Sequence, residues 1–441
     1  MRPRVVLFLT LALACDSTAP RDPAELRASS GDGQVGRVGT TLPAPLTVTV
    51  VDTRGTPLRG AKVRWTVSGG QLAPRSTVTD AEGKAQVRWT LGVTAGALQA
   101  TAAVADLDPA VFKATALESE LRYDELYPLK VPTYDGSGQV VHPDYAVSSG
   151  GPFQYSGHLA ITPYPFGDPH WENPSVFGGG SSLNWRLEEG APNPILTPSA
   201  GYLSDPDLVY VAETAELWLY YREVTRSNVI HLVRSRDGVH WSSPVQVASA
   251  PNHEIISPTV VRRGPKDWWM WAVNGGPGCE GAAASVEVRH SEDGEHWSPP
   301  GPVDLRQASF FPWHIDVQWI AARNEFWALY NVKLAGSCAT PAVFLATSPD
   351  GVNWTPRDQP LLAKGSIPAF ADVVYRSTLS YDPVSDDIVF WYSGARYDGH
   401  AYVWSAAVQR RKREDVFHPS NATSDPGPLL VPPPAELEEW P

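Results

Sequence analysis

The chain has 441 residues, of which 42% are hydrophobic, and it carries a formal net charge of −13. Its length allows two or three domains with buried cores. Its negative charge argues against nucleic acid as a partner and gives no electrostatic attraction to anionic lipid. The 17 Trp and 42 Pro residues, with little helical periodicity around them, predict an all-β protein rich in turns.

The N-terminus has the features of a targeting segment. A basic start precedes an apolar run at residues 5–13, which is too short to span a bilayer as a mature helix. The run ends in Leu11-Ala12-Leu13-Ala14-Cys15, which resembles the lipobox of bacterial lipoproteins. The resemblance implies a signal peptide at residues 1–14, a lipid on Cys15 and a polar tether at residues 15–24. The alternative is an ordinary secretory signal with an incidental cysteine.

These features predict where the protein resides. We expect an exported, membrane-anchored lipoprotein, periplasmic or at the cell surface. Its contact with the membrane would be through the lipid on Cys15 only, because no other stretch of the sequence is long and apolar enough to cross a bilayer.

Residues 25–117 form the first predicted domain. Apolar and polar residues alternate along several short segments, as they do in half-buried strands, and turns containing Asp and Gly separate them. This spacing predicts a β-sandwich. The segments are 46–50, 61–67 and 85–91, with turns at 52–55 and 79–83.

The sequence of this domain resembles the bacterial Ig-like group 1 domains of the invasin and intimin type. The resemblance covers nearly the whole domain and implies a stalk or spacer in a surface protein. No catalytic constellation is visible in it. The matching pieces are residues 46–51, 52–55, 63–65, 79–83, 89–92 and 112–116.

A repeat occupies the region at residues 139–417. A box with the pattern Ser-x-Asp-Gly-x-(His or Asn)-Trp occurs at 235–241, 291–297 and 348–354, after a degraded copy at 181–185. The closing tryptophans lie 56, 56 and 57 residues apart, so one supersecondary unit is repeated. Asp and Gly suit a tight turn and Trp packs it, which makes the boxes structural rather than catalytic.

The repeat predicts a five-bladed β-propeller. Each unit begins with an apolar strand, continues with a strand rich in aromatic residues and has a third strand that leads into the box, as blades do. The expected first strands start at 142–147, 205–210, 257–261, 314–319 and 370–375. Residues 118–138 are predicted to link the two domains. The tail at 418–441 contains a Pro-Pro-Pro run and is predicted to be extended and poorly ordered.

Acidic residues and histidines recur at the starts of these first strands, which line the channel of a propeller. Positions two apart in a strand share a face, so these side chains should converge at one end of the channel. One interpretation is that each Asp caps a strand by accepting backbone N–H groups. As a set, crowded carboxylates raise one another's pKa and indicate a functional site. The residues are Asp144, Asp207, Asp316 and Asp372, and, two positions earlier, His142, Asp205, Ser257, His314 and Phe370.

The strand starts and boxes, with five short motifs, resemble the five-bladed glycosidase propellers, notably glycoside hydrolase family 43 and its relatives. The motifs are Thr162-Pro163-Tyr164-Pro165, Glu172-Asn173-Pro174, Ser204-Asp205-Pro206-Asp207, Tyr375-Arg376-Ser377-Thr378 and Trp391-Tyr392-Ser393. The resemblance implies hydrolysis between a protonated acid and an ionised base. It implies Asp144 as the base, Asp205 as the orienting residue and Glu254 as the acid, although the family's blade-one Asp-Pro is His142-Pro143 here.

A second group of residues is expected to bind the sugar. No cofactor is expected, although a channel metal held by His314 and an Asp is an alternative. The binding candidates are Asp207, His142, Glu172, Trp171, Trp313, His314, Asp316 and Asp372.

Cys279 and Cys338 fall in the same loop of consecutive repeats. Disulfides persist in exported proteins, so we expect these two cysteines to pair, the alternative being two free thiols.

Two functions follow from these features. The first is a lipid-anchored, glycoside-hydrolase-like propeller that acts on poly- or oligosaccharide through carboxylate acid/base catalysis. The second is a non-catalytic, adhesin-like lipoprotein that binds carbohydrate or a surface. The clustered carboxylates favour the enzyme, and the irregular blade-one motif favours the binding protein.

Overall fold

A computed structural model describes residues 22–38, 40–92, 96–117, 121–148, 152–179, 185–307 and 310–418. The expected signal peptide, Cys15, most of the tether, the tail beyond residue 418 and residues 181–184 of the degraded box lie outside these ranges. The chain divides into two compact units, one formed by residues 1–91 with 95–117 and the other by the rest. Within the described ranges, no helix combines the length and the apolar character needed to cross a membrane.

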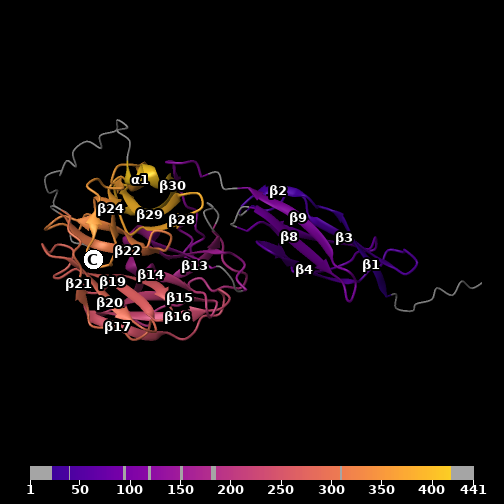
Figure 1. Cartoon of the computed structure of the whole chain (residues 1–441), viewed down its shortest axis with the longest axis horizontal. Coiled ribbons are helices and arrows are strands. Elements are labelled where there is room, and N and C mark those ends of the chain that lie inside the picture. The colour runs from indigo at the N-terminus through magenta and orange to yellow at the C-terminus, as the bar shows by residue number, and fades with distance from the viewer. Residues whose placement is uncertain are drawn as a thin grey trace, which may run out of the picture. The chain divides into compact units, whose positions relative to one another are not determined.

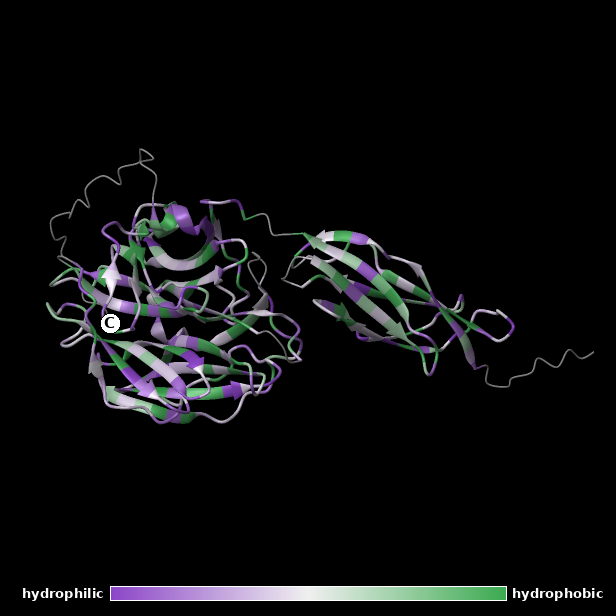
Figure 2. Cartoon of the chain, in the orientation of Figure 1, coloured by the Kyte–Doolittle hydropathy of each residue, from purple (hydrophilic) through white to green (hydrophobic). Residues whose placement is uncertain are grey.

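The first unit is the predicted β-sandwich, with two sheets (Figure 1). Apolar and polar residues alternate along its strands (Figure 2), and the inward side chains include the buried Trp65, Trp89 and Phe112. One sheet has the order β1 (Pro23–Ser30), β3 (Leu46–Asp52), β7 (Lys84–Thr90) and β5 (Gln71–Ala73). The other has the order β2 (Gln34–Arg37), β9 (Ala110–Leu117), β8 (Gly96–Ala103), β4 (Lys62–Val67) and β6 (Ser76–Val78).

The second unit is the predicted five-bladed propeller, because its strands form five separate antiparallel sheets in chain order. Blade one contains β11 (Val140–Val147), β12 (Gly157–Pro163) and β13 (Ser175–Gly179). Blade two contains β14 (Tyr202–Val211), β15 (Glu216–Val224), β16 (Ser227–Ser235) and β17 (Val245–Pro251). Blade three contains β18 (Ile256–Gly264), β19 (Asp267–Asn274), β20 (Ser285–Ser291) and β21 (Gly301–Pro302).

The remaining blades follow the same plan. Blade four contains β22 (Phe311–Ile320), β23 (Glu325–Lys333), β24 (Ala342–Ser348), β25 (Thr355–Pro356) and β26 (Leu362–Ala363). Blade five contains β27 (Val373–Val374), β28 (Thr378–Asp382), β29 (Asp387–Tyr397), β30 (Tyr402–Lys412) and β10 (Leu126–Pro128). The short helices are η1 (Pro165–Gly167), η2 (Pro169–Trp171), η3 (Pro368–Phe370) and α1 (Arg413–Phe417).

The segment expected to be a linker also closes the ring. Strand β10 pairs with β30, with Tyr127 opposite Val408, and so becomes the outermost strand of the last blade. A chain segment that precedes blade one therefore completes blade five. Residues 118–138 belong in part to the propeller, because pairing covers an edge of β30 that would otherwise be open.

The boxes join neighbouring blades. The box Asp accepts hydrogen bonds from backbone N–H groups two and three residues later, as Asp293 does from Glu295 and His296. Gly294 has a φ of 78°, and a Cβ there would lie 2.8 Å from the ring of Trp218 in the preceding blade. The Tyr220 hydroxyl of that blade donates to the carbonyl of Gly294. The boxes thus have the structural role that their composition indicated.

The inner edge of blade five is formed by β27 and β28, which both pair with β29. It is β28, rather than the segment at 370–375, that holds the positions equivalent to the other first strands. The hairpin of β28 and β29 ends at the pair Asp382 and Asp387, as that of β22 and β23 ends at Ile320 and Glu325. Counting back from these ends aligns Thr378 with Asp316. Blade five lacks an Asp-Gly box, so no repeat landmark fixed its register, and Asp372 is not at the equivalent position.

Candidate functional site

The inner strands are interrupted at the same point in three blades. The pairing register shifts between Val141 and Asp144 in β11, and at matching places in β14 and β18; in β22 the shift comes earlier, between Pro312 and His314, and His314 itself pairs with Asn331. At three of these shifts a non-glycine residue has a positive φ: His142 (57°), Asp205 (49°) and Ser257 (53°). Bulges of this kind re-aim side chains, and strained backbone of this kind is concentrated at functional sites.

The channel side chains form two layers rather than one cluster. We call the first the histidine layer; its members are His142, Asp205, Ser257, His314 and Arg376. We call the second the carboxylate layer; its members are Asp144, Asp207, Thr259, Asp316 and Thr378. The prediction that all the acidic residues surround one pocket is wrong, because residues two apart in a strand lie about 6–7 Å apart along the channel.

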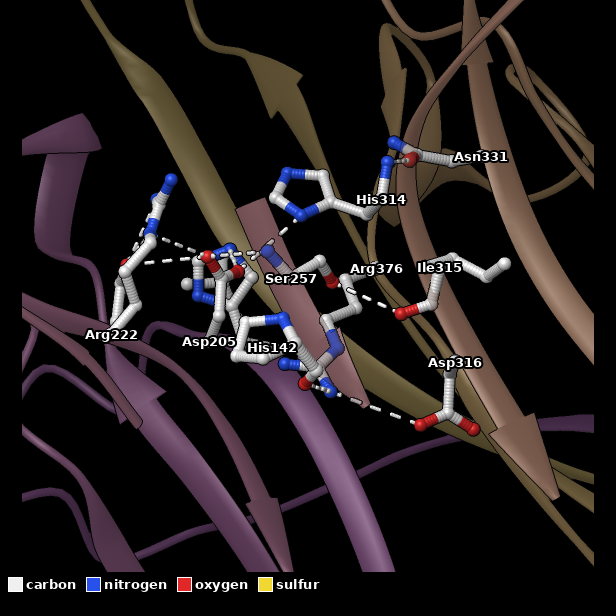
Figure 3. A network of polar contacts seen from close by, with 12 residues as sticks. His142, Asp205, Arg222, Ser257, His314, Ile315, Asp316, Asn331 and Arg376 are labelled. Atoms are coloured by element: carbon white, nitrogen blue, oxygen red, sulfur yellow. Dashed lines mark hydrogen bonds and ion pairs between the residues drawn. The ribbon is translucent and has the colours of Figure 1, made fainter. Parts of the chain in front are cut away.

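Three atoms converge in the histidine layer (Figure 3). Asp205 Oδ1 lies 3.3 Å from His142 Nε2 and 3.3 Å from His314 Nδ1. The other carboxylate oxygen of Asp205 is held by Arg222 Nε at 2.9 Å and by the backbone N–H of Ser257 at 3.2 Å. Burial alone would raise the pKa of Asp205, but Arg222 and the neighbouring histidines more than reverse this and hold it well below its usual range.

Apart from their contacts with one another, the converging atoms lack hydrogen-bond partners among the described residues. This holds for Asp205 Oδ1, His142 Nε2 and both ring nitrogens of His314, although all three residues are at most 2% exposed. Burial lowers the pKa of both histidines, so their rings are neutral. His142 Nδ1 contacts the Thr162 hydroxyl at 3.2 Å, which leaves Nε2 to face the Asp.

The chemistry of this donor set fits a metal ion. One atom from each of His142, Asp205 and His314 lies within 4.8 Å of the others. Two neutral imidazoles and one carboxylate are a ligand set for a divalent transition metal. Hydrogen bonds to the far side of a ligand, such as those that Arg222 and Thr162 make, are the usual supports of such a site.

Glu172 lies beside the histidine layer. Its Oε2 atom is 3.6 Å from His142 Nδ1, has no hydrogen-bond partner among the described residues and belongs to a residue that is 4% exposed. Burial, and to a lesser degree Asp205, raises the pKa of Glu172 well above its usual range. Glu172 was expected only to bind substrate, but its position beside His142 makes it a candidate for proton transfer.

The carboxylate layer holds the blades together. Asp144 accepts from the N–H of Leu208 at 2.6 Å, and Asp207 accepts from the N–H of Val260 at 2.9 Å. Each residue thus caps the inner strand of the next blade, which is the structural alternative considered for these aspartates. The structure therefore does not place Asp144 as a base beside the histidine layer.

A cation is already present in the carboxylate layer. Arg376 Nη2 lies 3.5 Å from Asp207 and 3.8 Å from Asp316. Burial, together with Asp207 and Asp316, raises the pKa of Asp144 well above its usual range. One oxygen from each of Asp144, Asp207 and Asp316 lies within 4.8 Å of the others. The positive charge of Arg376 and the raised pKa of Asp144, which favours its protonated form, reduce the repulsion between these groups.

A cavity of about 450 Å³ opens above the histidine layer. His314 and Arg222 form part of its lining, and six Tyr and Trp side chains form another part. The other lining residues include Tyr164, Tyr202, His253, Trp313, Thr340, Asp372, Tyr375, Tyr402 and Trp404. A separate cavity of about 410 Å³ lies at the other end of the inner strands and includes Asp144 and Asp207 in its lining.

The other predicted residues lie in different places. Trp313 and Asp372 line the larger cavity, and Asp372 accepts from the N–H of Tyr397. Trp171 packs against Tyr134 outside that lining. Glu254 is not in the lining either, and its charge acts on Arg289.

The position of Glu254 corrects its predicted role as the acid. His253 and Ile255 on either side of it have positive φ values of 65° and 54°. The turn that they make presents His253, not Glu254, to the cavity.

Sequence reasoning did not assign a role to Arg222 or Tyr375. Arg222 lies in the aromatic second strand of blade two, where no spacing rule points to the channel. Tyr375 was part of a family-like motif but received no role. Its ring packs 4.4 Å from that of His314.

Comparisons with known proteins agree with this architecture. Residues 41–113 match the family model of the bacterial Ig-like domain (group 1). Over 320 residues the chain is 30% identical to an A type blood N-acetyl-α-D-galactosamine deacetylase of Flavonifractor plautii, a match that covers 62% of this chain. The aligned part spans only 40% of that relative's length.

One solved structure shows the same fold, and a second is similar at a lower score. An N-acetylgalactosamine deacetylase from F. plautii, in complex with blood group B trisaccharide, is 25% identical with a TM-score of 0.60, over 66% of this chain and 96% of that one. A family 43 glycoside hydrolase from Bacillus licheniformis is 13% identical with a TM-score of 0.45, over 65% of this chain and 54% of that one. The chain thus carries a bacterial Ig-like group 1 domain followed by a five-bladed β-propeller whose relatives are carbohydrate-active enzymes.

Proposed function

We propose that the propeller is a metal-assisted carbohydrate hydrolase that removes the N-acetyl group from an amino sugar. The observation that carries the proposal is the convergence of His142, Asp205 and His314, with unpartnered buried atoms, below a cavity of about 450 Å³. The substrate class is taken from the relative that deacetylates N-acetylgalactosamine. A terminal N-acetylhexosamine of a glycan is therefore the expected substrate.

The geometry favours amide hydrolysis over cleavage of a glycosidic bond. Glycosidases of the usual kind need two carboxyl groups that flank the bond, about 5–5.5 Å or 6.5–9.5 Å apart. Asp144, the expected base, caps Leu208 in the carboxylate layer, and Glu254, the expected acid, is not among the residues that line the cavity. The acid/base glycosidase expected from the sequence is therefore the weaker hypothesis.

The reaction adds water to the acetamide carbonyl carbon, breaks the C–N bond and gives acetate and an amine. A divalent cation held by His142, Asp205 and His314 would supply Lewis acidity and a water that ionises near neutral pH. Arg222 and the Ser257 N–H hold one oxygen of Asp205, so that the other faces the two histidines.

Proton transfer needs a further group. Glu172, with an unpartnered Oε2 beside His142, is placed to pass a proton from the attacking water to the leaving nitrogen. The aromatic walls bind the apolar face of a sugar ring and limit the access of water.

The proposal is tested by acetate release. The purified chain is incubated with the methyl glycoside of N-acetylgalactosamine, before and after chelator treatment, and then with Zn²⁺, Mn²⁺ or Ca²⁺ added back. We expect release that chelation abolishes and one of these ions restores, and no cleavage of the methyl glycoside. Release that survives complete removal of metal would contradict the proposed site. Sugar binding without any hydrolysis would support the non-catalytic binding protein instead.

We also propose that the chain is exported and anchored to a membrane through a lipid on Cys15. The lipobox-like sequence supports this, as does the disulfide between Cys279 and Cys338, since disulfides persist in oxidising compartments. The test is metabolic labelling with a palmitate analogue. The expected label should be lost in the Cys15→Ser variant, and an unchanged label would refute lipidation at this residue.

A further inference from the structure

One half of the cavity is built from loops of blades three and four. It contains His253, Trp313 and Thr340, and also both cysteines. Cys279 lies in the loop after β19 and Cys338 in the loop after β23; their disulfide joins these loops with a Cα separation of 4.7 Å. The disulfide is thus part of the wall of the cavity that contains the proposed site.

The disulfide-bonded loop also positions Trp313. The ammonium group of Lys333 donates to the carbonyl of Cys279 at 2.7 Å and lies 5.6 Å from the centre of the Trp313 ring. A Cβ at Gly275 would lie 2.8 Å from this ring, so the loop backbone packs directly against the indole. The N–H of Gly275 donates to the carbonyl of His253, which ties the same loop to the other side of the wall.

Trp313 also adjoins the histidine layer. Its ring centre lies 6.2 Å from that of His314, in an edge-on arrangement. A ligand group that rests on the indole is therefore next to a ligand group held at His314. The blade-three and blade-four half of the cavity extends the proposed reaction site and is not a separate hollow.

Thr340 brings an unused polar group to this half. It lines the cavity and is 1% exposed, and its hydroxyl has no hydrogen-bond partner among the described residues. Buried hydroxyls are normally paired, so an unpaired one in a cavity wall indicates a ligand that supplies the partner. The residue lies two positions after Cys338, so the disulfide also fixes its place.

We infer that this half of the cavity is a subsite for a second sugar residue, next to the N-acetylated one. A pyranose has a C–H face that packs on an indole and hydroxyl groups that pair with a threonine. The cavity volume of about 450 Å³ falls within the range of pockets that bind drug-sized ligands. The inference rests on the proposed function in one respect: the adjacent position in the cavity must hold the N-acetylated sugar.

The inference predicts a preference for oligosaccharide. Binding is measured by calorimetry, in the presence of Zn²⁺, for the methyl glycoside of N-acetylgalactosamine and for a trisaccharide that ends in the same residue. We expect the trisaccharide to bind the wild type more than about 10-fold tighter, the usual effect of one buried aromatic contact. Thr340→Val, which keeps the shape and removes one neutral hydrogen bond, should lower this preference about 2- to 12-fold.

Two further variants and a control complete the experiment. Trp313→Ala should abolish the preference, and Cys279→Ser with Cys338→Ser should reduce it, as should chemical reduction of the wild type. Thr355→Val is the matched control, because Thr355 is an exposed threonine of the same blade outside the cavity lining. Its preference should equal that of the wild type.

The outcomes separate the subsite from the proposed reaction. Equal affinity of the wild type for both sugars, or an equal loss for both in Thr340→Val, would overturn the subsite even if acetate is released. A Thr340-dependent preference without acetate release would support the subsite and refute the reaction. No binding of either sugar would refute both.

Discussion

Replacing Asp205 by Asn should separate metal binding from folding. One oxygen of Asp205 accepts from Arg222 and Ser257, and the other faces the rings of His142 and His314. An Asn side chain keeps an oxygen for the first pair and turns its NH₂ group toward the ring nitrogens. Each ring, when neutral, has one acceptor nitrogen to which this NH₂ group can donate. The amide group thus occupies the space that the metal would take.

The size of the stability loss follows from Arg222, whose side chain is only 11% exposed. Removing one partner of a buried ion pair costs about 3–5 kcal/mol. The Asn oxygen restores part of this, because it still accepts a hydrogen bond from the charged guanidinium, a class worth about 1.5–3 kcal/mol. We therefore expect the free energy of unfolding to fall by about 1–2 kcal/mol, while metal binding and acetate release are lost.

The assay combines denaturant unfolding with metal content after dialysis. Asp207→Asn in the carboxylate layer is the matched control, since its amide oxygen can still accept from the N–H of Val260. The control should retain the metal content of the wild type. A fully metal-loaded Asp205→Asn protein would refute the assignment of the histidine layer, and loss of metal in Asp207→Asn would move the site to the carboxylate layer.

Three further predictions test neighbouring conclusions. Glu172→Gln should lower acetate release by about 10²–10⁴-fold, the usual contribution of a proton-transferring group, without changing the metal content. Full activity of this variant would exclude Glu172 as the proton-transferring group. Glu254→Gln should keep wild-type release, and a loss as large as that of Glu172→Gln would restore its predicted role as the acid. The side chain and backbone of Asn353, with the N–H of Val352, hold the pKa of Asp350 below its usual range. Its contribution to stability should therefore be present above about pH 4 and disappear as the pH falls below it. Unfolding curves of wild type and Asp350→Asn should differ at pH 7, and the difference should shrink steadily as the pH falls below about 4, so a constant difference would refute the linkage.

The fold could be predicted from the sequence because its signals are periodic. The regular interval between box tryptophans predicts the blades of a propeller, and the alternation of apolar and polar residues in the first domain predicts a β-sandwich. Both predictions are confirmed. Blade five was misplaced because it has no box, so that Arg376 and Thr378 were not recognised as channel residues. The closing strand at Leu126–Pro128 was missed because its three residues carry no periodicity.

The site was only partly predictable, because its geometry depends on backbone that departs from regular strands. His142, Asp205 and His314 were all candidates, but the sequence could not show that they separate from Asp144 and Asp316. The positive φ values at His142 and Asp205 decide this. A His or Ser residue gives no sign of a positive φ in the sequence, whereas a Gly does. The sequence favoured Glu254 over Glu172 as the acid, because the turn at His253 and Ile255, which presents His253 to the cavity, leaves no mark in the sequence pattern.

The two layers show how one set of strands serves two purposes. In the carboxylate layer the backbone is regular, the aspartates cap the next blade and Arg376 supplies the cation. Two residues earlier the backbone is strained, at about 1–3 kcal/mol for each residue with positive φ, and ring nitrogens and a carboxylate oxygen are left without partners. Strain of this kind persists only where the surroundings fix the conformation. The caps of the carboxylate layer and the box contacts between blades provide that constraint. Asp144 and Asp316 each also leave one buried oxygen without a hydrogen-bond partner in the described part of the chain, but the carboxylate layer holds the guanidinium of Arg376 among its aspartates. The histidine layer brings two imidazoles and a carboxylate together next to the cavity that His314 lines, which is why we propose it, rather than the carboxylate layer, as the reaction site.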